Sequence, residues 1–180
     1  MQKGIKNLNL TVVMAMLTAI SIICGKYLAI RGGDVMRFSL ENMPIIFAGM
    51  AFGPVAGAVV GAVADLLGCV LVAYTINPIV TLGAISIGVV SGILPMILKK
   101  TKASSHLTTA LTVLASHIVG SVIIKTIGLS AYYAMPFHVL VLWRLINYLI
   151  VGALDAVIVH VLLSNKEIML QISRLGGKEK

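Results

Sequence analysis

The sequence predicts an all-α integral membrane protein, a compact bundle of six transmembrane helices with both termini in the cytoplasm. Of its 180 residues, 59% are hydrophobic and only 11% are charged, and the mean hydropathy is +1.04. Its apolar runs are also long enough to span a bilayer, whose hydrocarbon core takes about 20 apolar residues to cross. These observations exclude a soluble globule with an ordinary charged surface.

Short polar segments join six apolar runs, so we expect a single transmembrane substrate-binding domain over residues 1–180. The predicted spans cover about residues 10–29, 36–52, 55–74, 78–98, 107–129 and 138–163. Lys3 and Lys6 precede the first run as they would in a signal peptide, but the bulky Ile23 before Cys24 argues against lipoprotein processing. We therefore expect the first helix to remain uncleaved.

The first two spans each carry a pair of residues at helical spacing. Ala15 and Ala19 put small side chains one turn apart on one face of the first span, which lets another helix approach closely. Arg37 and Glu41 stand four residues apart in the second span, close enough to form an ion pair. Gly53-Pro54 ends that span.

The third and fourth spans present glycines at four-residue spacing. Gly57 and Gly61 share a face with Asp65, and Gly88 and Gly92 form a second close-contact pair. We expect the first of these faces to pack against protein. Asp65 is expected to be structural and to pair with a buried donor, because an unpaired carboxylate inside a membrane is costly.

The last two spans carry polar residues along single stripes. His117, Ser121 and Lys125 follow one another at four-residue intervals in the fifth span, and Arg144 and Asp155 share a stripe in the sixth. Such groups are expected to face protein, a cavity or a ligand rather than lipid. Asp155 is expected either to pair within the bundle or to contact a partner, and the tail from residue 165 to 180 is polar and basic.

The distribution of Lys and Arg sets the orientation, because cytoplasmic segments carry an excess of both. Nine of the fourteen fall on the side that holds both termini, which is therefore assigned to the cytoplasm; they are Lys3, Lys6, Lys99, Lys100, Lys102, Lys166, Arg174, Lys178 and Lys180. The formal net charge of +8 thus follows largely from topology. We expect no nucleic-acid partner.

The other five cations gather at the outer ends of the spans, together with most aromatic residues. These cations are Lys26, Arg31, Arg37, Lys125 and Arg144, and the aromatic residues are Tyr27, Phe38, Tyr74, Tyr132, Tyr133, Phe137, Trp143 and Tyr148. The pattern favours a binding site for a flat, anionic solute. The alternative is an aromatic belt with snorkelling cations, but a belt is normally present at both interfaces.

Two asparagines and the absence of known motifs refine this hypothesis. The amides of Asn77 and Asn147 offer both donors and acceptors, which suit the edge of a heterocycle, although Asn77 before Pro78 is also suited to cap a helix. The histidines and the two cysteines show no metal-ligand spacing. Since no phosphate-binding loop or catalytic motif appears either, we expect no metal, no cofactor and no enzyme activity.

Residues 37–44, 48–54, 61–68 and 76–83 resemble a known family. About a third of the chain, including RFSLENMP and AGMAFGP, is similar to the substrate-binding (S) subunits of energy-coupling-factor vitamin transporters, and within these to the folate-specific family. The resemblance implies a subunit of a prokaryotic cell membrane that captures a vitamin from outside. It also implies docking, through Ala15 and Ala19, on a transmembrane coupling subunit that carries two cytoplasmic ATPase subunits.

The same resemblance implies a set of ligand contacts. Asn77 and Asn147 would meet the pterin edge of folate. The other proposed contacts are Tyr74, Tyr132 or Trp143 for ring stacking, and Lys125, Arg144 and Arg37 for the carboxylates. Three alternatives stay open: an S subunit for another anionic vitamin such as pantothenate, a structural or assembly membrane protein, and a self-sufficient secondary transporter, for which no inverted repeat is evident.

Overall fold

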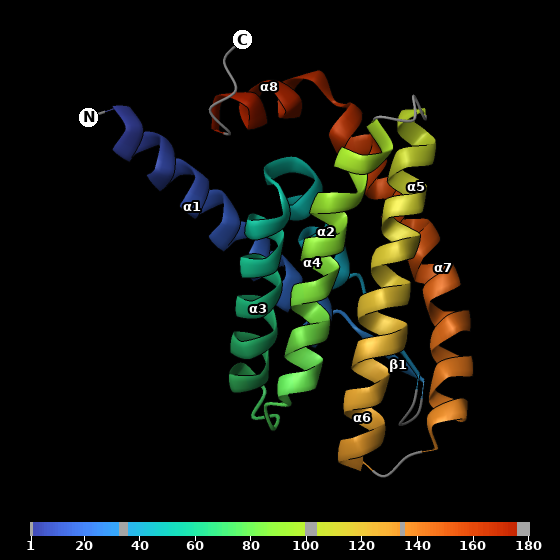
Figure 1. The fold of residues 1–180 in the computed structure, drawn as a ribbon. Coiled ribbons are helices and arrows are strands. Elements are labelled where there is room, and N and C mark those ends of the chain that lie inside the picture. The colour runs from blue at the N-terminus through green and yellow to red at the C-terminus, as the bar shows by residue number, and fades with distance from the viewer. Residues whose placement is uncertain (1, 33–35, 100–103, 134–135, 176–180) are drawn as a thin grey trace.

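The computed structural model describes residues 2–32, 36–99, 104–133 and 136–175 (Figure 1). The chain is mainly helical. Its α-helices are α1 Gln2–Ile22, α2 Asn42–Phe52, α3 Pro54–Leu71, α4 Pro78–Leu98, α5 Ser105–Ser116, α6 Lys125–Tyr133, α7 Phe137–Ser164 and α8 Lys166–Leu175. Two wider π-helical segments, η1 Ile23–Tyr27 and η3 His117–Ile124, continue α1 and join α5 to α6.

Five helical runs in the described part of the chain are long and apolar enough to cross a membrane. They are Leu8–Tyr27, Pro54–Leu71, Pro78–Leu98, Ser105–Tyr132 and Phe137–Ser164. The sixth apolar segment, α2, has only 11 residues, and at about 1.5 Å per residue it cannot cross a hydrocarbon core about 30 Å thick. The predicted class, a helical integral membrane protein, is confirmed, whereas the predicted count of six transmembrane helices fits only roughly, with five long helices and the short α2.

The prediction of one helix over residues 36–52 is wrong in its first part. Residues Met36–Phe38 form strand β2, which pairs antiparallel with β1, Ile30–Gly32, and α2 begins only at Asn42. A contact from another part of the fold holds the backbone of β2: the Asn147 side chain of α7 donates to the Arg37 carbonyl oxygen over 2.7 Å. A helix prediction based on apolar periodicity does not include that contact.

Both ends of the described chain lie at one end of the bundle, as predicted (Figure 1). The start of α1 and the whole of α8 are found there, whereas the α3–α4 connection lies at the opposite end. Residues 166–175, predicted only as a polar tail, form an amphipathic helix that contacts α1 and α7. Its Ile172 is buried in the hydrophobic core, which gives this otherwise polar segment a reason to fold.

Helices α3 and α4 pack through their glycines, as the four-residue spacing predicts. A Cβ atom added at Gly88 would lie 2.1 Å from the carbonyl carbon and oxygen of Gly57, and one at Gly61 would lie 2.4 Å from the Ala84 carbonyl oxygen. No side chain fits between backbones this close. The two helices therefore form a tightly packed wall, and Asp65 of α3 accepts a hydrogen bond of 2.7 Å from Thr81 of α4.

Gly88→Ala tests the importance of this backbone contact. The added methyl group meets main-chain atoms that cannot rotate away, so we expect a loss of about 3 kcal/mol or more and a fall in melting temperature of about 5 to 10 °C. Leu82→Ala, on the exposed face of the same helix, is the control and should shift melting by about 2 °C or less. Equal melting temperatures for the two variants, measured in detergent, would contradict close packing at Gly88.

Candidate functional site

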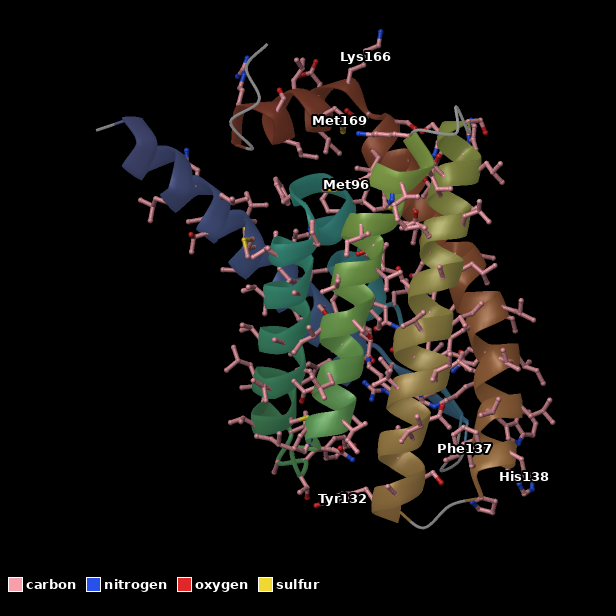
Figure 2. The ribbon with its side chains drawn as sticks, viewed as in Figure 1. Met96, Tyr132, Phe137, His138, Lys166 and Met169 are labelled. Atoms are coloured by element: carbon pink, nitrogen blue, oxygen red, sulfur yellow. The ribbon has the colours of Figure 1, made fainter. Side chains whose placement is uncertain are left out.

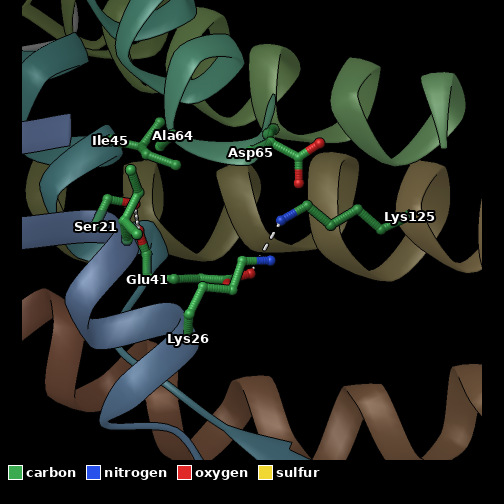
Figure 3. A pocket seen from close by; sticks show the side chains of 9 residues that line it. Ser21, Lys26, Glu41, Ile45, Ala64, Asp65 and Lys125 are labelled. Carbon is green, nitrogen blue, oxygen red and sulfur yellow. Dashed lines mark hydrogen bonds and ion pairs between the residues drawn. The ribbon is translucent and has the colours of Figure 1, made fainter. Parts of the chain in front are cut away.

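A small cavity, with about 20 Å³ of free space, lies between α1, η1, α2, α3, α4 and α6. It is lined by Ser21, Ile22, Lys26, Glu41, Ile45, Ala64, Asp65, Ala84 and Lys125. The side chains of Lys26, Glu41, Asp65 and Lys125 converge in it (Figure 3). Since Asp65 lies toward the end of α3 opposite the chain termini, the cavity lies in the half of the bundle that the Lys and Arg distribution assigns to the outside.

Glu41 is the centre of an ion-pair cluster in this cavity. Its Oε1 lies 3.3 Å from Lys125 Nζ and its Oε2 lies 3.0 Å from Arg37 Nη2. The same Arg37 nitrogen also donates to the Gly25 carbonyl oxygen in η1. The predicted pairing of Arg37 with Glu41 is confirmed, but Arg37 lies in strand β2 and Glu41 just before α2, not on one face of a helix.

Lys125 is held inside the protein even though it carries a charge. It is only 5% exposed, and its helix enters the cavity region directly after the π-helical segment η3. A π-helical turn is wider than an α-helical one and often marks functional positions. The predicted stripe of His117, Ser121 and Lys125 is thus buried along its whole length.

Arg144 and Asn147 of α7 lie beside this cluster. Arg144 Nη1 donates to the Ser121 carbonyl oxygen over 2.5 Å, so the guanidinium points into the bundle. Asn147 Nδ2 donates to Arg37, whereas Asn147 Oδ1 and Arg37 Nε are buried without a hydrogen-bond partner in the described part of the chain. Buried polar atoms without partners are rare, and these two can bond to a ligand.

The remaining predicted contacts lie further from the cavity. Asn77 caps α4, accepting from the backbone N–H groups of Ile79 and Val80, while its Nδ2 donates to the Gly128 carbonyl oxygen over 2.9 Å. The alternative role as a helix cap is therefore observed. Tyr132 lies at the outer end of α6 and is 52% exposed (Figure 2), and Trp143 is 38% exposed on α7. The predicted contacts thus divide into two sets. The inner group lies at or beside the cavity and consists of Arg37, Lys125, Arg144 and Asn147; the rim consists of Tyr74, Asn77, Tyr132 and Trp143.

Lys26 joins the site although it was not among the predicted contacts. Its Nζ lies 5.7 Å from the centre of the Tyr74 ring, a cation–π contact, and it lines the cavity together with Lys125. Its stem passes over Gly68, where a Cβ would lie 2.7 Å from Lys26 Cε. The sequence did place Lys26 among the outer cations. It could not show which way the side chain points, because Lys26 lies at the end of the first span.

A second polar cluster lies deeper in the bundle, between α2, η3 and α7. His117 Nε2 lies 3.0 Å from Asp155 Oδ2, and the two side chains are 1% and 0% exposed. Asn42 Nδ2 lies 3.4 Å from His117 Nδ1 and 3.1 Å from Ser121 Oγ. Asp155 therefore pairs within the bundle. No group of three or more His, Cys, Asp or Glu side chains suited to a metal occurs among the described residues.

Comparisons with known proteins point to one family. A family model described as "ECF transporter, substrate-specific component" matches residues 9–163. The curated folate transporter FolT of Clostridium novyi (strain NT) is 30% identical over 66 residues, which is 37% of this chain and 38% of that protein. The alignment with this relative thus spans well under half of its length.

Three solved structures share the fold. FolT bound with folic acid matches with a TM-score of 0.66 at 22% identity, covering 83% of this chain and 88% of that one. The S-component for biotin from an ECF-type ABC transporter matches with a TM-score of 0.66 at 19% identity, over 88% and 92% of the two chains. The S component of a bacterial ECF transporter gives 0.53 at 17%, over 94% and 96%.

The buried pair between His117 and Asp155 should contribute strongly to stability. Removing one partner leaves the other buried without compensation, so His117→Ala and Asp155→Ala should each cost about 3 kcal/mol or more. The double variant should cost much less than the sum of the two. Melting temperatures of all three proteins measure this coupling, and strictly additive losses would show that the two side chains do not interact.

Proposed function

This chain belongs to the family of substrate-specific components of ECF transporters, and on that premise we propose that it is the high-affinity folate-capture subunit of such an importer. It is a multi-pass protein of the prokaryotic cell membrane, and the proposed site opens toward the extracellular side. We propose that it has no catalytic activity of its own. ATP hydrolysis would be supplied by two ATPase subunits bound to a transmembrane coupling subunit.

One observation carries the choice of an anionic vitamin: the cations that converge on the cavity in the outer half of the bundle. Lys26 and Lys125 line this cavity, and Arg37 reaches its central carboxylate. Cations held away from water bind carboxylates strongly, because charge-assisted hydrogen bonds gain from a low dielectric. The likeness to a folate transporter adds support for folate over other carboxylic acids.

The inner group and the rim suit different parts of folate. We propose that Lys125, Arg37 and Arg144 bind the glutamate carboxylates, and that Asn147 Oδ1, which has no hydrogen-bond partner among the described residues, accepts from the pterin edge. Tyr74, Trp143 and Tyr132 supply aromatic surface at the rim for stacking. We also propose Asn77 as a contact at the rim. Its Oδ1 caps α4 and its Nδ2 bonds to Gly128, so the second N–H of Nδ2 is the group left for a ligand.

The proposed coupling subunit has a suitable surface on α1. Ala15 and Ala19 are both exposed on this helix, on a face that the described remainder of the bundle leaves uncovered. Small side chains at this spacing allow a second helix to approach closely in a membrane. The cavity residues Ser21 and Ile22 at the end of α1, and Lys26 in η1, follow this surface in the chain and stay separate from it.

Titration of the purified protein with a small vitamin panel tests the function. We expect folate to quench or shift the fluorescence of Trp143 and to raise the melting temperature, since a ligand present at 100 times its Kd stabilises by about 2.7 kcal/mol. Pantothenate and biotin should have no effect. A response to pantothenate alone would make the chain an S subunit for that vitamin, whereas uptake into vesicles without coupling subunits would favour a secondary transporter.

Lys125→Met should weaken folate binding at least about tenfold, because a charge-assisted hydrogen bond contributes about 1.5 to 3 kcal/mol. Met retains most of the apolar stem and so limits damage to packing. Lys166→Met, at an exposed position on α8, is the matched control and should bind normally. Undiminished folate affinity in Lys125→Met, measured by isothermal titration, would remove Lys125 from the site.

Ala15→Trp and Ala19→Trp should separate binding from transport. A bulky ring on this face blocks close approach of a partner helix, so folate binding should persist while uptake by the assembled transporter falls at least about tenfold. Ala153→Trp, on the exposed face of α7, is the control and should leave uptake intact. Normal uptake in both α1 variants would place docking elsewhere.

A further inference from the structure

The position of Glu41 raises a question that the proposed function leaves open. A site for carboxylates should present free cations, yet an acidic side chain of the protein already occupies the centre of this one. Glu41 binds Lys125 through Oε1 and Arg37 through Oε2, at 3.3 Å and 3.0 Å. The two cations come from α6 and β2, which are far apart in the sequence, and Glu41 is the group that joins them.

Glu41 differs in this respect from the other acidic residue of the cavity. Asp65 accepts a short hydrogen bond of 2.7 Å from the Thr81 hydroxyl within the wall formed by α3 and α4. Among the described residues no cation lies within ion-pair distance of Asp65, whereas Glu41 bridges two. Asp65 is thus part of the wall, and Glu41 alone competes directly for the cations that a ligand carboxylate needs.

We propose that Glu41 is an internal counter-anion, which holds the carboxylate position of the site and is displaced when the carboxylate of a ligand binds Lys125 and Arg37. This inference rests on the proposed function and names a determinant of its specificity. Anionic ligands bind by exchanging one carboxylate for another. An uncharged ring has no group to offer Lys125 in return and leaves the Glu41 bridge in place.

The electrostatics explain why a counter-anion is required. Lys125 is 5% exposed, and a buried ammonium without a partner is costly by several kcal/mol. With Glu41 in place the ammonium is always paired, either with the protein or with the ligand. The site can therefore keep a deeply buried cation without destabilising the fold, at the expense of part of its affinity for anions.

The backbone around Glu41 is suited to release the side chain alone. The Glu41 carbonyl oxygen accepts from Ser21 Oγ over 2.6 Å, which fixes the main chain to α1. Gly25 leaves the space in which the carboxylate lies, since a Cβ there would be 2.7 Å from Oε2. Moving the carboxylate away would also enlarge the cavity, which has only about 20 Å³ of free space while Glu41 lies in it.

Glu41→Gln tests the inference, because it removes the charge and keeps the shape. The probes are folate and 6-hydroxymethylpterin, which has the pterin ring and no carboxylate. We expect folate to bind about tenfold more tightly to the variant, as one competing charge-assisted bond is lost, and the pterin to change by less than about twofold. Glu41→Met, of similar volume and without charge, should show the same selective gain if Gln perturbs the fold.

Two controls identify the cause of any gain. Glu41→Asp retains the charge and should bind folate no more tightly than the unaltered protein. Glu167→Gln makes the same exchange at an exposed position on α8 and should change neither affinity. Melting temperatures of all variants establish that each is folded at the temperature of the titration.

Several outcomes would overturn the inference. If Glu41→Gln weakens folate and the pterin together, Glu41 accepts from the ring and is an ordinary ligand contact; if it strengthens both equally, the effect is not exchange of carboxylates. If the unaltered protein binds pantothenate and not folate, the proposed substrate is wrong, but the inference is tested on pantothenate and its uncharged alcohol, panthenol. The same tenfold selective gain for the acid would support it, and its absence would refute it.

Discussion

The structure depends on one constraint: a charged side chain inside a bilayer must have a partner. The apolar surroundings supply no water, so an isolated ion costs several kcal/mol or more. The chain answers in two ways. His117 and Asp155 pair with each other in the centre of the bundle, and Lys125, Arg37 and Glu41 form an ion-pair cluster around the cavity. The second arrangement borders the cavity, which Glu41 and Lys125 line.

The cavity has a tightly packed side and a more loosely packed side. On one side, α3 and α4 meet through glycines, with main-chain atoms in direct contact. On the other side, the three cations lie on separate elements: Arg37 on β2, Lys26 on η1 and Lys125 on α6. These elements contact one another largely through side chains. Ligand binding and release are therefore expected to rearrange the second side, while the glycine wall keeps its geometry.

The sequence predicted only some of the residues that form the site. The outer placement of the cations, the pairing of Arg37 with Glu41 and the inward stripe of Lys125 follow from charge and helical spacing. Of the predicted contacts, however, only Lys125 lines the cavity itself; Arg37, Arg144 and Asn147 lie beside it. Lys26 was missed because the direction of a side chain at a helix end depends on the π-helical segment η1, which leaves no mark in apolar periodicity.

The sequence by itself determined that this chain crosses a membrane and that its third and fourth spans each carry a glycine face for close packing, and its Lys and Arg residues predict which end faces the cytoplasm. These properties depend on local composition and on spacings of four residues, and both can be read along one helix. Tertiary structure decided that residues 36–38 are a strand, that residues 166–175 are a helix, and that Glu41 bridges two cations. Each of these depends on contacts between residues far apart in the chain: Asn147 with Arg37, Ile172 with the core, and Lys125 with Glu41.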